Sequence, residues 1–207
     1  MNRHTQQTIC IVSGESSGDF LGAALAKALL KNNPALNLIG MGGKQMKAAG
    51  VETVIDAGTL DIMGWLDVIT HFPLIRRTMR TLQSNLKKSN ANLLILIDYP
   101  GFNLRLAKWA KKEGFQILYY SCPQIWAWHY SRIHAIKRDI DHMAVLFPFE
   151  KTLYEKESQA VTYVGHPLTQ KVAAATADPQ RVRALGFETT KPIVALLPGS
   201  RKNELKA

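Results

Sequence analysis

Five consecutive apolar residues, 93–97 (LLILI), constrain the fold of this chain more than any other segment. The run is continuous, branched and bounded by polar residues, so it predicts a strand that is buried on both faces of a sheet. A second run of this kind, residues 8–12 (TICIV), lies near the N-terminus and ends at Ser13 and Gly14. Continuous apolar strands are typical of parallel sheets covered by helices on both faces.

The other apolar runs alternate with stretches of helical spacing. Further strands are expected over 36–41, 51–55, 116–120, 143–147 and 161–164. Helices are expected over 20–31, 44–49, 62–88 (with an interruption near Pro73), 103–112, 133–137 and 150–156. Asp19 is expected to be the N-cap of the first helix. This alternation predicts a doubly wound α/β fold with a Rossmann-like parallel sheet.

Composition narrows the class of protein. The 207 residues are 46% hydrophobic and 20% charged, which is typical of a globular chain rather than a disordered one. No apolar run approaches the ~18 residues of a membrane-spanning helix, and no signal peptide is visible. The two cysteines, Cys10 and Cys122, fit a reducing compartment and form no metal-binding cluster. We therefore expect a cytoplasmic protein.

The net charge of +10 suits an anionic partner, either a membrane surface or nucleic acid. The sequence contains no zinc-ligand spacing, no aromatic pattern of an RNA-binding sheet and no helix-turn-helix signature. We therefore expect no nucleic-acid partner. A basic surface that is merely solvated remains the open alternative.

The last thirty residues indicate the opening of another α/β unit. A polar helical stretch begins at Asp178-Pro179, and residues 193–197 (IVALL) predict a new strand that enters Pro198-Gly199-Ser200-Arg201. We expect residues 1–188 to form one domain and residues 189–207 to open a second, truncated domain. On this interpretation the chain is a fragment.

The segment from Gly14 to Asp19 (GESSGD) follows the first predicted strand. Ligands of doubly wound sheets bind beyond the carboxyl ends of strands, where glycines allow close approach of the backbone. Gly14, Glu15, Ser17 and Gly18 are therefore candidate site residues. A simple glycine turn followed by a helix cap is the open alternative.

Asp98 occupies the corresponding position at the end of the 93–97 run. A carboxylate at this edge of a sheet suits a general base. Tyr99 precedes Pro100, so its backbone is expected to be extended and Asp98 is not expected to cap a helix. A turn aspartate bonded to its own loop is the alternative.

Three other loops carry candidate residues. Trp126 and Trp128 follow the 116–120 strand and could wall a pocket or pack in the core. His166 follows the 161–164 strand. Ser200, Arg201 and Glu204 follow the 193–197 strand, where a guanidinium and backbone N–H groups suit a diphosphate.

The stretch 62–88 combines apolar bulk with a basic flank. That composition fits a helix at an anionic membrane surface, and it also fits a core helix with an exposed basic face. The candidate membrane contacts are Trp65, Leu66, Ile69, Phe72, Arg76 and Arg77.

Together these segments resemble the lipid-A-disaccharide synthase family of glycosyltransferases. Eight stretches appear in the family's order: SGESSGD, GMGG with Met46, IMG, LLILIDYPGFN, SCPQIWAWHYSRI, LFPFE, YVGHPL and LLPGSRKNE. The resemblance implies a GT-B architecture, of which this chain would be the N-terminal, acceptor-side half. One departure is His129, where the family often has Arg.

The resemblance also implies the reaction. An inverting transfer, without metal or cofactor, would move 2,3-diacylglucosamine from its UDP conjugate to the 6-hydroxyl of 2,3-diacylglucosamine 1-phosphate. The enzyme would act as a peripheral protein on the cytoplasmic face of the inner membrane. The chain alone would be inactive, because the second domain of a GT-B enzyme supplies most of the UDP site.

The resemblance assigns roles to the candidate residues. The implied catalytic residues are Asp98, which corresponds to the family's general base, Arg201, an arginine that stabilises anionic charge, and Glu15, a residue of the pocket. The implied substrate-binding residues are Gly14, Ser17, Gly18, Asn103, Trp126, Trp128, His166, Ser200 and Glu204.

Two alternatives remain open at the level of sequence. One is another UDP-sugar GT-B enzyme, such as a murein-type N-acetylglucosaminyltransferase or a UDP-N-acetylglucosamine epimerase. The other is a basic α/β module that only binds a membrane or nucleic acid.

Overall fold

The computed structural model describes residues 7–57, 72–176, 178–187 and 192–197. The chain divides into two compact units, Met1–Pro167 and Leu168–Ala207, and each is described by itself.

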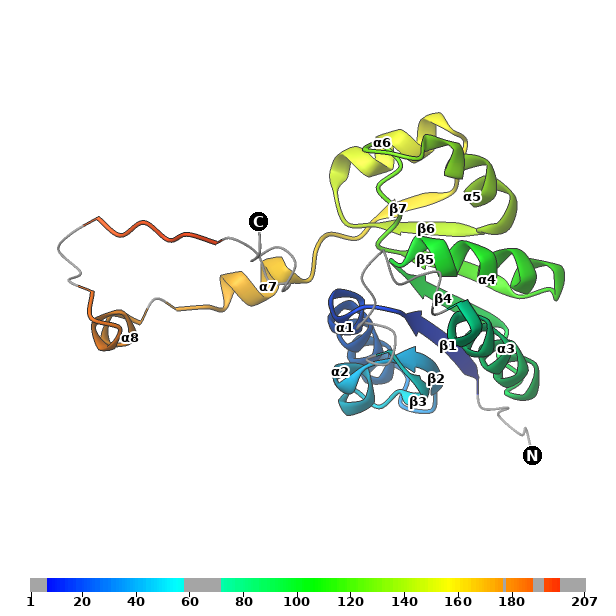
Figure 1. Cartoon of the computed structure of the whole chain (residues 1–207), viewed down its shortest axis with the longest axis horizontal. Coiled ribbons are helices and arrows are strands. Elements are labelled where there is room, and N and C mark those ends of the chain that lie inside the picture. The colour runs from blue at the N-terminus through cyan, green and yellow to red at the C-terminus, as the bar shows by residue number, and fades with distance from the viewer. Residues whose placement is uncertain (1–6, 58–71, 177, 188–191, 198–207) are drawn as a thin grey trace. The chain divides into compact units, whose positions relative to one another are not determined.

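The first unit is built on one parallel sheet (Figure 1). Within the described residues its strand order is β3-β2-β1-β4-β5-β6-β7, and every neighbouring pair is parallel. The strands are β1 (Thr8–Ser13), β2 (Asn37–Gly42), β3 (Glu52–Asp56), β4 (Leu93–Ile97), β5 (Gln116–Tyr120), β6 (His142–Val145) and β7 (Val161–Tyr163). The strands predicted for this unit are confirmed. The order reverses direction between β1 and β4, which makes that pair the topological switch point.

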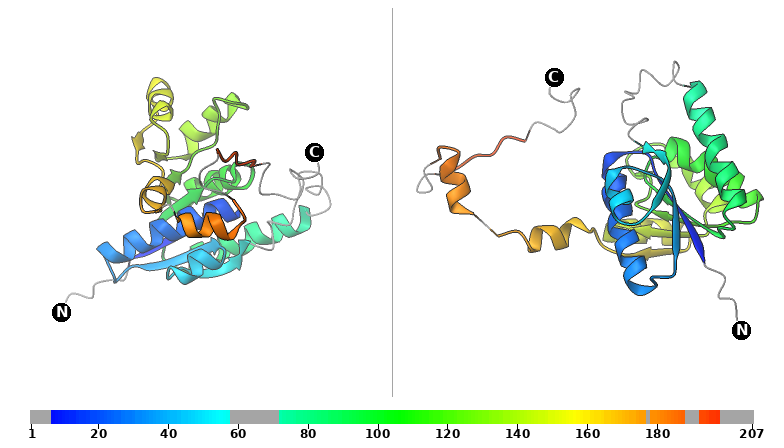
Figure 2. Two further views of the ribbon diagram at one scale, coloured as in Figure 1. Left: turned by 90° about the vertical axis from the view of Figure 1, so that its left-hand side faces the viewer. Right: turned by 90° about the horizontal axis from the view of Figure 1, so that it is seen from below.

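Helices cover both faces of this sheet. They are α1 (Ser16–Asn32), α2 (Lys44–Ala48), α3 (Phe72–Lys88), α4 (Pro100–Lys112), α5 (Ile133–Asp139) and α6 (Pro148–Lys156), with a short 3₁₀ turn at Tyr130–Arg132. The right-hand view of Figure 2 shows α1 and α3 on opposite sides of the strands. The doubly wound arrangement follows from strands that are apolar on both faces, since each face must be covered.

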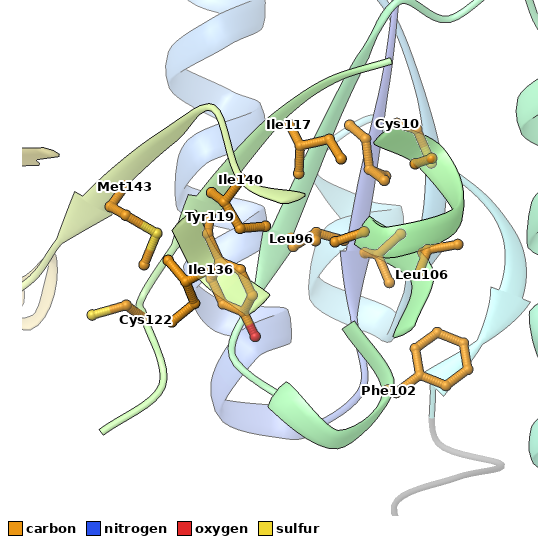
Figure 3. Close-up of a cluster of buried hydrophobic side chains, with 14 of the residues drawn as sticks. Cys10, Leu96, Phe102, Leu106, Ile117, Tyr119, Cys122, Ile136, Ile140 and Met143 are labelled. Atoms are coloured by element: carbon orange, nitrogen blue, oxygen red, sulfur yellow. The ribbon is translucent and has the colours of Figure 1, made fainter. Parts of the chain in front are cut away.

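Alternate residues of each strand enter two separate cores. Ile95 and Ile97 of β4 pack with α1 and α2, whereas Leu94 and Leu96 pack with α3, α4 and α5. Figure 3 shows the second core, in which the ring of Tyr119 lies beside Ile136. Tyr119 is fully buried, so its ring belongs to the core even though its hydroxyl bonds to a loop.

The role predicted for Asp19 as the N-cap of α1 is wrong. The helix begins earlier, at Ser16, and Asp19 is buried in its first turn. Its carboxylate instead accepts hydrogen bonds from the backbone N–H groups of Gly43, Gln45 and Met46, at 2.7, 3.0 and 3.0 Å. An aspartate with this many N–H donors caps the neighbouring helix α2, because those groups have no partner within that helix.

Helix α3 starts close to the predicted interruption. Pro73 lies in its first turn, where a missing N–H costs no helical hydrogen bond. The rest of the predicted stretch up to residue 71 lies outside the described residues.

The second unit contains α7 (Leu168–Ala173) and α8 (Pro179–Ala184). Asp178 caps α8 by accepting bonds from Gln180 N and Arg181 N, as expected for an aspartate before a proline. The strand predicted over 193–197 is not formed, since residues 192–197 have no strand partner among the described residues. Leu196 and Leu197 are 86% and 90% exposed, because apolar sequence alone cannot form a ladder without a neighbouring strand.

Substitution of Gly40 tests the close approach of β2 to β1 in the sheet. A Cβ at this position would lie 1.8 Å from the carbonyl oxygen of Ile11 on β1, and φ is +152°. We expect Gly40→Ala to lower the free energy of unfolding by about 3 kcal/mol or more, measured by urea denaturation, since neither backbone can move without breaking the ladder.

Gly101 in α4 provides the matched control. A Cβ there meets nothing within 4 Å, so Gly101→Ala should raise the free energy of unfolding by about 0.5–1 kcal/mol. Equal effects of the two substitutions would contradict the described approach of β1 and β2.

The reactivity of the two thiols tests whether Cys10 and Cys122 are buried. Burial raises the pKa of Cys10 to about 12, and burial together with the Glu150 carboxylate raises the pKa of Cys122. Both thiols therefore stay protonated and shielded at pH 8, and we expect Ellman's reagent to label them at least about 100-fold more slowly in the folded chain than in urea. Cys122→Ser would assign the two phases, and fast labelling of the native chain would refute the burial.

Candidate functional site

The loops that follow β1 and β4 leave the sheet side by side. Ser13 at the end of β1 pairs with Ile97 at the end of β4, so Gly14 and Asp98 follow neighbouring residues. The first loop leads into α1 on one face of the sheet and the second into α4 on the other. This is the position at which doubly wound folds bind ligands.

Gly14 and Tyr99 bring these two loops into contact. Gly14 is buried, and a Cβ on it would lie 2.4 Å from Cδ1 of Tyr99. Burial raises the pKa of Tyr99, and the negative charge of Glu15 raises it further. The aromatic ring therefore lies against the first loop and within electrostatic reach of the Glu15 carboxylate.

The expectation that Tyr99 is extended is wrong. Tyr99 has φ 47° and ψ 55°, and Asp98 has φ 46°, so two consecutive non-glycine residues are left-handed. Pro100 only excludes the right-handed helical region for Tyr99, and tertiary contacts decide between the conformations that remain. Left-handed residues of this kind cost about 1–3 kcal/mol each and cluster at functional sites.

Hydrogen bonds from three directions hold this conformation. Asn103 Nδ2 donates to the carbonyl oxygens of Ile97 and Asp98, at 3.1 and 2.7 Å. The hydroxyl of Tyr119 donates to the same Asp98 oxygen at 2.6 Å. The N–H of Asp98 donates to the carbonyl oxygen of Ser121 at 3.2 Å. The backbone of Asp98 is thereby fixed while its side chain stays half-exposed.

The remaining residues of the first loop differ in exposure. Gly18 is buried, and a Cβ on it would lie 2.4 Å from Oγ of Ser13. Ser17 is exposed in the first turn of α1, and Glu15 is half-exposed at its N-cap position. Glu15 and Ser17 are therefore accessible from solvent, whereas Gly14 and Gly18 permit close packing of the loop.

Aromatic side chains line the exits of β5, β6 and β7. Trp126 is 48% exposed and meets Phe149 edge to face at 5.3 Å, and Phe149 stacks on Phe147 at 5.8 Å. The ring of His166 lies 6.1 Å from Phe147. Trp128 is 71% exposed. The alternative that these tryptophans pack in the core is therefore wrong. Trp126 forms an aromatic surface with Phe147, Phe149 and His166, and Trp128 stacks on His129.

Glu150 anchors this aromatic surface, and sequence reasoning missed it. It is buried, and its carboxylate accepts bonds from Leu146 N and Phe147 N at 3.2 and 3.0 Å. Cys122 donates its S–H to the other oxygen at 3.4 Å. Its position three residues after the start of a Phe-Pro turn is a helix-capping signal that could have identified it.

Helix α3 separates its apolar and basic residues. Leu82 and Leu86 are buried, and Ile75 and Met79 pack against the same core. Phe72, Arg76 and Arg77 are exposed, with Phe72 at 55%. The apolar residues of this helix are therefore used mainly in the core. The other predicted membrane contacts, Trp65, Leu66 and Ile69, lie outside the described residues, as do Ser200, Arg201 and Glu204.

The described residues form neither a cluster of metal-ligating side chains nor a membrane-spanning helix. Among residues 7–57, 72–176, 178–187 and 192–197, no three His, Cys, Asp or Glu side chains gather as metal ligands would. In the same ranges no helix is both long and apolar enough to cross a bilayer.

The geometry supports proton transfer at an accessible carboxylate. Asp98 lies at the switch point on a fixed backbone, beside a loop that carries a second carboxylate, Glu15. Such an arrangement can take a proton from a hydroxyl bound at the carboxyl edge of the sheet. The exposed aromatic rings nearby along this edge can pack against apolar or sugar surfaces.

Two solved structures have a similar fold. A sucrose-phosphate synthase structure from Thermosynechococcus elongatus has a TM-score of 0.53 at 14% identity, covering 87% of this chain and 100% of that chain. A UGT transferase from Siraitia grosvenorii, solved with UDP, has a TM-score of 0.50 at 11% identity, covering 76% and 50%. These similarities confirm the predicted Rossmann-like fold of the GT-B kind.

Curated relatives found by sequence have a much higher identity to this chain than these two structures have. The lipid-A-disaccharide synthase of Coxiella burnetii (strain Dugway 5J108-111) is 48% identical over 201 residues, which are 97% of this chain and 54% of that protein. The Trichlorobacter lovleyi synthase is 45% identical, covering 95% and 51%. Lipid-A-disaccharide synthase 1 of Legionella pneumophila (strain Lens) is 47% identical, covering 96% and 52%.

The chain thus spans about half the length of the curated relatives it matches. The family model described as lipid-A-disaccharide synthetase matches residues 9–207. A match over this share of the sequence settles the family. The chain belongs to the lipid-A-disaccharide synthetase family.

Proposed function

We propose that the full-length gene product is a lipid-A-disaccharide synthase and that this chain supplies its acceptor-side domain. The observation that carries the proposal is the half-exposed Asp98 on a fixed, left-handed backbone at the switch point, in a chain 48% identical to a synthase of that name. Other UDP-sugar enzymes share the fold, but membership of the family favours this reaction over theirs.

The proposed reaction is a single inverting displacement. Asp98 takes the proton from the 6-hydroxyl of 2,3-diacylglucosamine 1-phosphate as the oxygen attacks C1 of the sugar in UDP-2,3-diacylglucosamine. The bond between C1 and the UDP oxygen breaks as the β-1,6 bond forms, and UDP leaves with the electron pair. Arg201 is proposed to stabilise the anionic charge of UDP or of the acceptor phosphate. The reaction needs neither metal nor cofactor.

The other candidate residues receive binding roles in this proposal. Glu15, with Ser17, borders the acceptor beside Asp98. Trp126, Trp128 and His166 form an apolar wall of the cleft, and their exposure supports this role. Asn103 was expected to bind substrate, but its described bonds are to the loop backbone, and direct contact with substrate remains a prediction.

Turnover tests this proposal directly. The full-length protein should release UDP and disaccharide from the two acylated substrates in a buffer that contains EDTA. Hydrolysis or epimerisation of UDP-N-acetylglucosamine without formation of the disaccharide would overturn it. The 207-residue chain alone should give no disaccharide.

Replacement of Asp98 tests the assignment of the base. In the full-length protein, Asp98→Asn should lower kcat by about 10²–10⁴-fold with little change in KM, because the amide cannot accept the proton. Asp141→Asn is the matched control. Asp141 accepts a bond from Ile117 N at the amino end of β5, so its replacement should leave kcat unchanged. Wild-type turnover by Asp98→Asn would exclude Asp98 as the base.

We also propose that the protein docks on the cytoplasmic surface of the inner membrane, since both substrates carry acyl chains. The exposed Phe72, Arg76 and Arg77 at the start of α3 support this docking, because a basic surface attracts anionic lipids.

Vesicle binding tests the docking. Arg76→Glu with Arg77→Glu should weaken binding to vesicles containing phosphatidylglycerol by about 10-fold or more, since each basic residue contributes about 1 kcal/mol. Lys27→Glu with Lys31→Glu changes the net charge equally on the exposed side of α1 and is the control. Equal weakening by both pairs would show that only net charge matters, not this helix.

A further inference from the structure

The carbonyl oxygen of Asp98 is bonded by two buried side chains from different elements. Tyr119 reaches it from β5 with its hydroxyl at 2.6 Å, and Asn103 reaches it from α4 with Nδ2 at 2.7 Å. Both side chains are 0% exposed. These two donors therefore fix the peptide that follows Asp98 from inside the protein.

The backbone conformation and hydrogen bonding around Asp98 cost conformational free energy, which indicates that they do more than stabilise the fold. Asp98 and Tyr99 are both left-handed without being glycine. In addition, Oδ1 of Asn103 is buried and has no hydrogen-bond partner among the described residues. An unpartnered buried oxygen costs about 1–3 kcal/mol, and the two hydrogen bonds that the Asn103 amide donates must offset this cost. Strain that the surroundings hold in place is a feature of functional loops.

Tyr119 also interacts electrostatically with the Asp98 carboxylate. Burial raises the pKa of the Tyr119 hydroxyl well above its usual value, and the negative charge of Asp98 raises it further. The hydroxyl therefore stays protonated at neutral pH and acts as a donor rather than as an acid or base. Figure 3 shows its ring beside Ile136 in the core, so the donor is rigidly placed.

We propose that Tyr119 is a positioning residue for Asp98. Together with the amide of Asn103, its hydroxyl holds the Asp98 carbonyl so that the backbone stays left-handed and the carboxylate keeps the orientation from which it takes the acceptor's proton. The inference rests on the proposed function, in which Asp98 is the base. Tyr119 itself touches no substrate.

Tyr119→Phe in the full-length protein is the direct test. The substitution keeps the ring in the core and removes only the hydroxyl. We expect kcat to fall about 10-fold to 100-fold while KM stays within about twofold, since a misplaced base slows the chemical step without weakening substrate binding. A general loss of folded protein would lower the active fraction instead, so kcat is calculated per folded molecule from the unfolding transition of each variant.

Gln159→Met provides a control for stability. Gln159 is buried and donates Nε2 to the carbonyl oxygen of Ile140 at 3.0 Å, near the amino ends of β6 and β7. Like Tyr119→Phe, the Gln159→Met variant therefore loses one buried hydrogen bond to a backbone carbonyl oxygen, but at a position away from the site. Its kcat should equal that of the wild type. An equal fall of kcat in both variants would overturn the proposal.

Asn103→Leu is the second variant, in case Tyr119→Phe folds poorly. It removes the other donor together with the unpartnered oxygen, and kcat should again fall more than KM changes. Wild-type kcat in either folded variant, with Asp98→Asn inactive, would overturn the positioning role and leave the proposed function intact. Wild-type turnover by Asp98→Asn would instead overturn the proposed function itself.

Discussion

Burial of the sheet on both faces is the constraint on which the rest of this structure depends. In a parallel strand such as β4, the side chains on both faces are buried. Each connection to the next parallel strand must cross one face of the sheet, so all strands begin at one edge and end at the other. The loops that follow the strands consequently gather at one edge. Where the order reverses between β1 and β4, the two loops diverge to opposite faces and leave Gly14 and Asp98 side by side.

Acidic side chains at this edge divide into two kinds. Asp19 and Glu150 are buried and accept three and two backbone N–H bonds. The bonds of Asp19 tie α1 to the start of α2, whereas those of Glu150 cap its own helix, α6. Glu15 and Asp98 are half-exposed at the switch point. A carboxylate surrounded by backbone donors is stabilised as a structural anchor, whereas one that faces solvent can exchange a proton with a ligand. Burial, not residue type, therefore separates the anchors from the candidate base.

Helix α3 shows how packing resolves an ambiguous composition. Its sequence fits a membrane-surface helix and a core helix equally well. The structure places Leu82 and Leu86 in the core and leaves Arg76 and Arg77 exposed. The apolar bulk therefore stabilises the domain, and membrane docking depends on the exposed basic residues and Phe72.

The sequence by itself determined the alternation of strands and helices, the parallel sheet and the placement of Asp98 at a strand end. These follow from local apolar patterns such as 93–97, which act over a few residues. Only the tertiary structure decided that Asp19 caps α2, that Tyr99 is left-handed, and that Tyr119 and Asn103 hold the Asp98 carbonyl. Each of these depends on a hydrogen bond or contact between elements, and no local pattern reports such a partner. Residues 193–197 illustrate the same limit, because an apolar run becomes a strand only when a neighbouring strand pairs with it.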